Sequence, residues 1–358
     1  MSANRRMGWI VRAAVLALSA SPWAPGAAVA QTLMNGAGAT FPYPLYSKWF
    51  DEYAKVEPGM RFNYQSIGSG GGIRQILERT VDFGATDGPM TDDQLKKAPG
   101  ELLHIPAVLG AVVATYNLPG NPKLKFPPDV LADIFLGKIL KWNDDRIRAV
   151  NAGVQLSNQP IVIVHRSDGS GTTYIWVDYL SKISPEWEKQ VGRGTSVKWP
   201  VGLGGKGNEG VAGQVKNTPG ALGYVELAYA STNKLPVAQI RNQAGKFVEP
   251  TIDSTTAAAA GLAKTMPADF RVSLTNAPGE SAYPIASFTW LLLYRDQPDA
   301  TKGKALVKFL WWAIHDGQKY APELLYAPLP TEVVKQIEER IKQVTFQGKP
   351  LLVSTSPR

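Results

Sequence analysis

Residues 161–172 read IVIVHRSDGSGT, and this change from an apolar run to a polar turn is the clearest sign of the fold. The β-branched run predicts a strand over Ile161–His165. After the turn, Trp176, Tyr179 and Leu180 recur at helical spacing, so a helix is expected there. The stretch therefore predicts a strand, a short turn of glycine and hydroxyl residues, and then the start of a helix.

Two earlier stretches have the same design. Residues 36–42 read GAGATFP and precede a helix with an aromatic face. Residues 64–72 read YQSIGSGGG and precede a helix expected from about Gly72 to Thr80. The aromatic face of the first helix is formed by Tyr46, Trp49, Phe50 and Tyr53.

The rest of the chain continues to alternate between strand and helix patterns, which predicts an α/β fold with mainly parallel sheets. Thr91 with Gln94 three residues on is a capping-box signal for a further helix. The segment Asp253–Ala263, rich in Thr and Ala, is expected to be a surface excursion. Further strands are expected at Arg61–Gln65, Val81–Ala85, Ala111–Tyr116, Ala221–Glu226 and Thr289–Tyr294.

The three turns are suited to binding an anion. The first N–H groups of a helix lack intrahelical partners, and the helix dipole favours negative charge at that end. Glycine allows close approach of the backbone, and Ser or Thr adds a hydroxyl donor. A single turn of this kind is also explained by ordinary helix capping. Three such turns, one of them opened by Arg166, favour an anion site.

Asp87 is the most informative single residue. An ionised carboxylate only accepts hydrogen bonds, so it repels a fully ionised anion but accepts from a ligand that keeps a proton. Phosphate keeps one or two protons near neutral pH, whereas sulfate keeps none. Asp87 in an anion cleft would therefore favour phosphate over sulfate. The competing interpretation is that Asp87 caps the turn formed by Gly88 and Pro89.

These stretches resemble the phosphate-binding protein of the phosphate-specific ABC transporter. The resemblance covers about residues 33–351. It rests on GAGATFP (36–42), YQSIGSGGG (64–72), VDFGATD (81–87), RSDGSGT (166–172) and KWPVGLGGKGN (198–208), with Gly137-Lys138, Lys141-Trp142 and GYVE (223–226) in addition.

The resemblance implies a two-lobed periplasmic-binding-protein fold (type II-like), with a mainly parallel sheet in each lobe and the ligand in the cleft between them. Lobe 1 would comprise residues 31–108 and 279–358, and lobe 2 residues 109–278. Asp168, which can orient Arg166, and Gly68 would support the site. The implied phosphate-binding residues are Thr40, Phe41, Ser69, Asp87, Arg166, Ser170, Gly171 and Thr172. The backbone N–H groups of Phe41 and Gly171 would contribute to binding.

The N-terminus has the three parts of a secretory signal peptide. Three arginines precede an apolar stretch, and Ala28-Val29-Ala30 is a cleavage signature, so cleavage after Ala30 and a periplasmic location are expected. Arg5-Arg6 leaves twin-arginine export open. Removal of these 30 residues lowers the formal charge from +8 to about +5 and leaves 328 residues, enough for two lobes.

Composition excludes several functions. The chain has no cysteine, which excludes disulfides, thiolate metal sites and a cysteine nucleophile. Basic residues are interleaved with acidic ones, so no nucleic-acid partner is expected. No metal-ligand spacing is present, and neither a metal nor a cofactor is expected. The expected partners are inorganic phosphate and the permease subunits of an inner-membrane ABC transporter, and the protein itself is expected to be a monomer.

Three alternatives stay open at the level of sequence. The first is a secreted phosphatase or hydrolase, although no nucleophile with an adjacent base is evident. The second is a secreted adhesion or signalling protein, and the third a binder of sulfate, molybdate or a phosphate ester. His165 is expected to point away from Arg166 because neighbours in a strand face opposite sides. The loop Gly202–Asn208 has no assigned ligand role and is expected to be a turn at the edge of a lobe.

Overall fold

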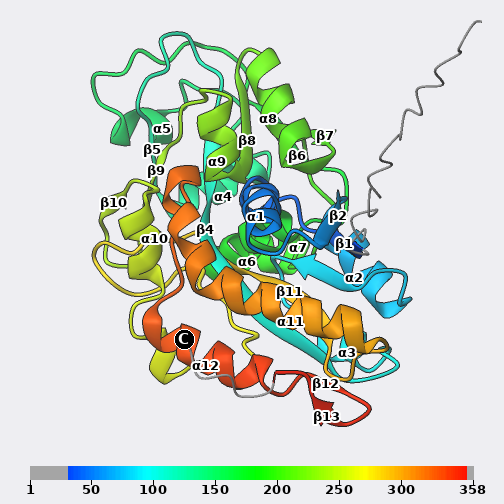
Figure 1. Ribbon diagram of the computed structural model, residues 1–358. Coiled ribbons are helices and arrows are strands. Elements are labelled where there is room, and N and C mark those ends of the chain that lie inside the picture. The colour runs from blue at the N-terminus through cyan, green and yellow to red at the C-terminus, as the bar shows by residue number, and fades with distance from the viewer. Residues whose placement is uncertain (1–30, 353–358) are drawn as a thin grey trace, which may run out of the picture. The chain divides into compact units, whose positions relative to one another are not determined.

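The computed structural model describes residues 31–352, in which strands alternate with helices (Figure 1). The prediction of an α/β fold is therefore confirmed. The predicted signal peptide, residues 1–30, lies outside the described residues. The strands are β1 (Thr32–Gly38), β2 (Met60–Ser66), β3 (Phe83–Thr86), β4 (Leu102–Tyr116), β5 (Lys125–Phe126), β6 (Val162–Arg166), β7 (Leu203–Gly205), β8 (Ala221–Glu226), β9 (Gln239–Arg241), β10 (Phe247–Val248), β11 (Ala286–Tyr294), β12 (Thr345–Phe346) and β13 (Lys349–Pro350). The α-helices are α1 (Tyr43–Val56), α2 (Ser69–Leu77), α3 (Asp92–Leu95), α4 (Pro128–Phe135), α5 (Asp145–Val150), α6 (Gly171–Ile183), α7 (Pro185–Gln190), α8 (Gly207–Asn217), α9 (Leu227–Thr232), α10 (Ile252–Ala258), α11 (Ala300–Ile314) and α12 (Thr331–Ile341).

Eight of the described strands form one mixed sheet in the order β2-β1-β3-β11-β4-β8-β6-β7. In the first half of this order, β1 is parallel to β2 and β3, and β11 runs antiparallel between β3 and β4. In the second half, β6 is parallel to β7 and β8, and β8 is antiparallel to β4. Each half of the sheet is thus mainly parallel, with one strand running against the others.

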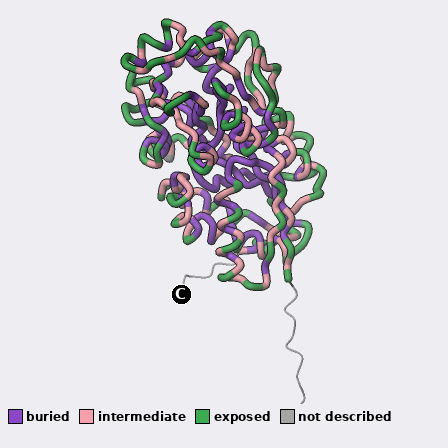
Figure 2. The backbone as a smooth tube through the Cα atoms, turned by 90° about the horizontal axis from the view of Figure 1, so that it is seen from above, coloured by how far each residue is buried: buried purple, intermediate pink, exposed green. Residues whose placement is uncertain are grey.

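The long strand β4 belongs to both halves of the sheet. It pairs with β11 up to Ala111, and from Val112 onward it pairs with β8. Every residue of β4 and of β11 is buried, and Figure 2 shows buried residues concentrated along the middle of the molecule. Continuous apolar runs of this kind are typical of strands covered on both faces.

The helix α1 joins the N-terminal and C-terminal parts of the described chain. Its predicted aromatic face packs inward, and the ring centroid of Phe50 lies 4.3 Å from that of Phe62 on β2. The Trp49 indole N–H donates to the carbonyl oxygen of Gly317 at 2.7 Å. Phe309 on α11 packs on Tyr53, with 5.2 Å between the ring centroids. Aromatic pairs of this kind stabilise the packing beyond the area that they bury.

The structure corrects three local predictions. The helix α2 begins at Ser69 rather than near Gly72, because the glycine turn itself is helical. The strand β4 begins nine residues before the predicted Ala111. The segment Asp253–Ala263, predicted as a surface excursion, includes most of α10, which is capped by Thr251 just before it and in which Ser254 is buried. The capping box predicted at Thr91 is confirmed.

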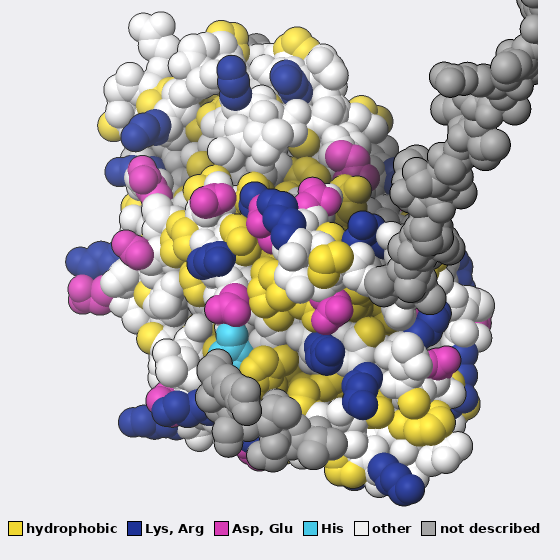
Figure 3. Space-filling view, in the orientation of Figure 1, with side chains coloured by type: hydrophobic (Ala, Val, Ile, Leu, Met, Phe, Trp, Pro, Cys, Tyr) yellow, Lys and Arg dark blue, Asp and Glu magenta, His cyan; other side chains and the backbone are white. Residues whose placement is uncertain are grey.

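Within residues 31–352, no helix is long and apolar enough to cross a membrane. On the face shown in Figure 3, Lys and Arg side chains lie among Asp and Glu side chains. This face therefore carries no continuous basic patch of the kind that binds nucleic acid.

Candidate anion-binding site

The eight residues predicted to bind the ligand are all buried. Where they lie, hydrogen bonds join turns that follow strands from the two halves of the sheet. The Gly171 backbone N–H donates to Ser69 Oγ at 3.0 Å, and the Gly70 N–H donates to the Gly169 oxygen at 2.9 Å. The glycine turn that starts α2 therefore packs directly on the turn that starts α6.

The helix starts are held in place by local capping. Ser170 is the N-cap of α6, and its Oγ accepts from the Thr173 backbone N–H at 3.0 Å. Gly68 precedes α2 with a φ of +87°, in the region that favours glycine. A Cβ on Gly68 would lie 2.3 Å from Asp168 Oδ2, so only glycine fits between the two turns. Two helix N-termini thus direct their positive dipole ends toward the same buried place.

Arg166 provides the buried positive charge. Its guanidinium makes two hydrogen bonds to Asp168, at 2.8 Å from Nε to Oδ1 and 2.5 Å from Nη2 to Oδ2. Asp168 Oδ1 also accepts from the Gly207 N–H at 3.1 Å. Burial opposes ionisation of Asp168, but the hydrogen bonds and charge of Arg166 outweigh it and lower the pKa of that carboxyl. Because the Arg166 side chain is only 1% exposed, this pair orients the guanidinium inside the protein rather than on its surface.

Asp87 is the acidic member of the site. Its Oδ1 accepts from Thr289 Oγ1 at 2.8 Å, and its Oδ2 lies 3.4 Å from Ser69 Oγ. Burial raises the pKa of Asp87 to about 7, against the hydrogen bond from Thr289 and the charge of Arg166. Asp87 therefore changes between carboxylic acid and carboxylate near neutral pH.

The Gly88-Pro89 turn is held by the residue before Asp87. The Gly88 N–H donates to Thr86 Oγ1 at 3.2 Å, and Thr86 Oγ1 donates to the Gly88 oxygen at 2.5 Å. Thr86 thus makes the contacts that the alternative interpretation assigned to Asp87, and the Asp87 carboxyl faces Ser69 and Thr289 instead.

Asn208 is a site residue that the sequence analysis missed. It is fully buried at the start of α8, and its Nδ2 donates to Thr40 Oγ1 at 2.7 Å and to Thr172 Oγ1 at 3.0 Å. The expectation that Gly202–Asn208 is only a turn at a lobe edge is therefore wrong at its last residue. A signal was present, since residues 203–208 again place a short strand before a glycine turn and a helix start.

Two tyrosines hold the backbone of the first turn. The hydroxyl of Tyr229 donates to the Thr40 carbonyl oxygen at 2.5 Å, and that of Tyr326 donates to the Phe41 carbonyl oxygen at 2.6 Å. The Phe41 ring is buried, with its centroid 6.2 Å from that of Tyr326. These contacts come from residues far away in the chain, so no local pattern predicted them.

Known proteins are similar in sequence to this chain over most of its length. The sequence pattern described as "PBP superfamily domain" matches residues 25–314. The phosphate-binding protein PstS of Pasteurella multocida is 49% identical over 317 residues, which cover 87% of this chain and 90% of that protein. PstS of Haemophilus influenzae is 48% identical over 332 residues, covering 92% and 96% respectively. This chain belongs to the PstS family.

Solved structures agree with this PstS family assignment at the level of the fold. A high-affinity periplasmic phosphate-binding protein, PfluDING, determined with phosphate bound, has a TM-score of 0.68 at 20% identity and covers 90% of this chain and 100% of its own. A phosphate-binding protein from Stenotrophomonas maltophilia has a TM-score of 0.68 at 21% identity and covers 86% and 94%. The predicted two-lobed periplasmic-binding-protein fold is confirmed.

The three histidines of this PstS family member make contacts of their own. His165 stacks on Trp199 with 4.8 Å between ring centroids, as expected for a residue facing away from Arg166. His104 Nε2 accepts from the Met90 N–H at 3.1 Å, and burial lowers the His104 pKa to about 3. His315 Nε2 lies 2.9 Å from a Glu338 carboxylate oxygen. None of these rings is paired with a serine or threonine hydroxyl, and the described residues contain no metal-binding cluster.

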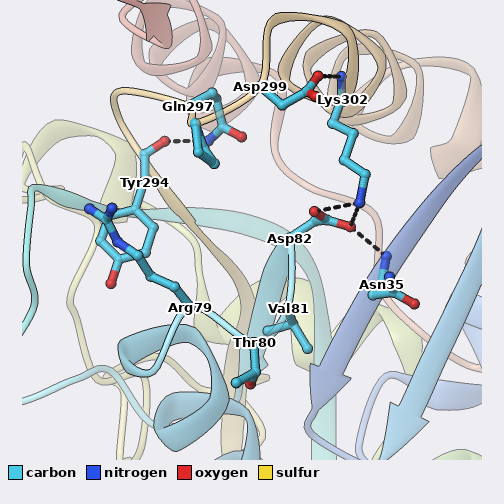
Figure 4. A pocket seen from close by; sticks show the side chains of 10 residues that line it. Asn35, Arg79, Thr80, Val81, Asp82, Tyr294, Gln297, Asp299 and Lys302 are labelled. Atoms are coloured by element: carbon cyan, nitrogen blue, oxygen red, sulfur yellow. Dashed lines mark hydrogen bonds and ion pairs between the residues drawn. The ribbon is translucent and has the colours of Figure 1, made fainter.

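A separate surface pocket lies beside β1, β3 and α11 (Figure 4), and its lysine, Lys302, is already paired with Asp82. Lys302 Nζ lies 2.9 Å from Asp82 Oδ2, which also accepts from the Asn35 N–H at 2.8 Å. The guanidinium of Arg79 lies 4.6 Å from the centroid of the Tyr294 ring. This pocket is therefore a weaker candidate for binding an anion than the site at Arg166 is.

Chemically, the buried site combines one guanidinium, several hydroxyls, helix N-termini and a single acidic acceptor. Tetrahedral oxyanions are bound in this way, by a bidentate guanidinium and backbone N–H groups. The acidic acceptor suits an anion that still carries a proton.

Proposed function

We propose that this protein binds inorganic phosphate at the buried site around Arg166. The observation that carries the proposal is that a buried guanidinium, Arg166, and a buried carboxyl, Asp87, belong to the same site, where Asp87 is held by the Thr289 hydroxyl. A protonated phosphate oxygen donates to Asp87, while the other oxygens accept from Arg166 and the hydroxyls. Relatives named phosphate-binding protein PstS support the same ligand.

The binding residues in this proposal are those of the resemblance, with Asn208 and Thr289 in supporting positions. Asp168 and Gly68 also support the site, by orienting Arg166 and by allowing close contact of the two turns. The ligand set is Thr40, Phe41, Ser69, Asp87, Arg166, Ser170, Gly171 and Thr172.

The protein acts, in our proposal, as the substrate-binding component of a phosphate ABC transporter. It is exported, cleaved after Ala30, captures phosphate in the periplasm as a monomer and passes it to the permease subunits. Membership of the PstS family supports this role, and the solved relative PfluDING is described as periplasmic. The protein is a binder without catalytic residues.

The two lobes close on the ligand, with lobe 1 formed by residues 31–108 and 279–358 and lobe 2 by residues 109–278. The change of partner in β4 at Ala111 and Val112 supports a crossing in this part of the chain. The packing of α1 on Gly317 and on Phe309 supports a lobe built from both ends of the chain. A ligand held between two such lobes fits hinge-type closure.

Thermal unfolding tests the proposal on protein freed of ligand by denaturation and refolding. Phosphate at about 1,000 times its dissociation constant is expected to stabilise the protein by about 4 kcal/mol. Sulfate at the same concentration is expected to leave the unfolding temperature unchanged. If phosphate also leaves it unchanged, the proposed ligand is wrong.

The hydrolase alternative has its own test. Ser69 lies near Asp87, but no histidine is paired with it, so a chromogenic phosphate monoester is expected to be left intact. Release of the chromophore in proportion to protein concentration, and its loss in Ser69→Ala, would establish a hydrolase instead.

A further inference from the structure

The buried side chain of Asn208 makes hydrogen bonds to two of the threonines proposed to bind phosphate. Its side chain contacts Thr40, which follows β1, and Thr172, near the start of α6, so one carboxamide joins the two sides of the site. Its Oδ1 accepts from the Glu226 backbone N–H at 2.9 Å. All four residues are buried, and both hydrogens of the Asn208 NH₂ group have an acceptor.

The Glu226 contact decides which way the carboxamide faces. A backbone N–H can only donate, so the atom opposite Glu226 must be the Asn208 oxygen. The NH₂ group of Asn208 must then point at Thr40 and Thr172. The direction of these hydrogen bonds follows from the chemistry of the groups and does not depend on how the amide atoms are assigned.

Both threonine hydroxyls are thereby filled as acceptors. Thr40 Oγ1 accepts from Asn208 Nδ2 and, at 3.2 Å, from the Asn208 backbone N–H. Thr172 Oγ1 accepts from Asn208 Nδ2 and, at 3.4 Å, from Arg166 Nη1. A hydroxyl has two acceptor positions and one hydrogen to donate. Each threonine is left with its O–H alone, so it meets a ligand as a donor.

The two acceptor positions of Ser69 are filled by backbone N–H groups rather than by a side chain, and its O–H faces Asp87 Oδ2 at 3.4 Å. Its Oγ accepts from the backbone N–H groups of Gly171 at 3.0 Å and Asp87 at 3.2 Å. The donor polarity of Ser69 therefore comes from the backbone, whereas that of Thr40 and Thr172 depends on Asn208.

We propose that Asn208 is a positioning residue for phosphate binding, which forces the hydroxyls of Thr40 and Thr172 to donate to the anion. This inference rests on the proposed function. Because both hydrogens of its NH₂ group are taken, Asn208 acts through the two threonines rather than by contact with phosphate. It also selects against neutral or cationic ligands that would need those hydroxyls as acceptors.

The test measures phosphate dissociation constants by isothermal titration calorimetry on ligand-free protein. Asn208→Ala frees one acceptor position on each threonine and is expected to weaken binding by about tenfold. Asn208→Asp has nearly the same shape but only accepts when ionised, so the threonine O–H groups turn toward it; a loss of about a hundredfold is expected.

A double-mutant cycle separates this role from general support of the structure. If Asn208 acts through the hydroxyls, Asn208→Ala is expected to cost less than about twofold in a Thr40→Val, Thr172→Val background. An equal loss in both backgrounds, or unchanged affinity of Asn208→Ala in the wild-type background, would overturn the inference.

The matched control is Asn151→Ala. Asn151 is a buried asparagine with three side-chain hydrogen bonds, to Lys125 and Ile147, away from the site. It is expected to lower the unfolding temperature and to leave phosphate affinity unchanged; a parallel loss of affinity would mean that any buried asparagine has this effect and would overturn the inference. Failure of the wild-type protein to bind phosphate would reject the proposed function itself. The measurement on the wild-type protein therefore distinguishes failure of the proposed function from failure of the role proposed for Asn208.

Discussion

At the scale of single residues, the site depends on one buried positive charge. Arg166→Ala removes the guanidinium and leaves the Asp168 carboxylate near the anion without its partner, so phosphate affinity is expected to fall by at least about a hundredfold. Calorimetry on the ligand-free variant measures this. The control is Arg241→Ala, which removes a surface arginine that lies 3.6 Å from Asp129. A loss smaller than about threefold in Arg166→Ala would contradict the site assignment.

Asp87 is expected to determine which oxyanion is bound. Above about pH 7, where Asp87 is mostly ionised, Asp87→Asn replaces an acceptor that repels a fully ionised anion with a neutral amide that can donate. The ratio of phosphate to sulfate affinity is therefore expected to fall by at least about tenfold. Competition titrations with both anions measure the ratio, with the exposed Asp93→Asn as the control. An unchanged ratio would mean that selectivity has another source.

Asp87 also predicts how the stability of the ligand-free protein changes with pH. Its pKa is about 7 in the folded protein and 3.8 as the ordinary value, so the fold holds this proton more tightly than the unfolded chain does. The stability that protonated Asp87 contributes is present below about pH 4 and is lost as the pH rises through about 7. The free energy of unfolding of Asp87→Asn minus that of wild type should rise by up to about 4 kcal/mol over this range.

Denaturant unfolding of both proteins at several pH values measures that difference, and the subtraction removes the effect of groups common to both. A difference that stays constant from pH 4 to pH 8 would show that Asp87 is ionised in the ligand-free fold throughout.

At the scale of elements, the close packing of two glycine turns is the decisive feature. Gly68→Ala adds a Cβ that would lie 2.3 Å from Asp168 Oδ2, so the turns must separate and phosphate affinity is expected to fall by about tenfold or more. Gly120→Ala is the matched control, because Gly120 has a φ of +76° but open space around it. The control should lose about 1 kcal/mol of stability and no affinity. Equal affinities for the two variants would contradict the packing argument.

The sequence predicted those elements whose signal is local. The strand–turn–helix pattern around Arg166 and the helical spacing of Tyr46 and Trp49 led directly to β6, α6 and α1. The start of α2 was missed because Ser69 and the following glycines have low helix propensity, and tertiary packing overrides that preference. Thr289 stands within β11, and only its pairing with β3 and β4 places it at Asp87. No local pattern contains that register.

At the scale of the whole molecule, the site is complete only when both halves of the sheet contribute residues to it. Hydrogen bonds from Gly70 to Gly169 and from Gly171 to Ser69 join the two halves. Phosphate is therefore expected to slow amide hydrogen exchange in peptides that contain residues 68–72 and 169–173 by at least about tenfold. Peptides from α12 serve as the internal control. Equal protection with and without phosphate would mean that the lobes are already closed in the ligand-free protein.

One buried site is proposed to bind a phosphate that still carries a proton. Calorimetric titration of ligand-free, full-length mature protein with phosphate, and then with sulfate, above about pH 7, where Asp87 is mostly ionised, measures whether it does. We expect one phosphate bound per chain and no heat of binding for sulfate. Binding of both anions with similar affinity would contradict the role of Asp87, and no binding of phosphate would contradict the proposed function.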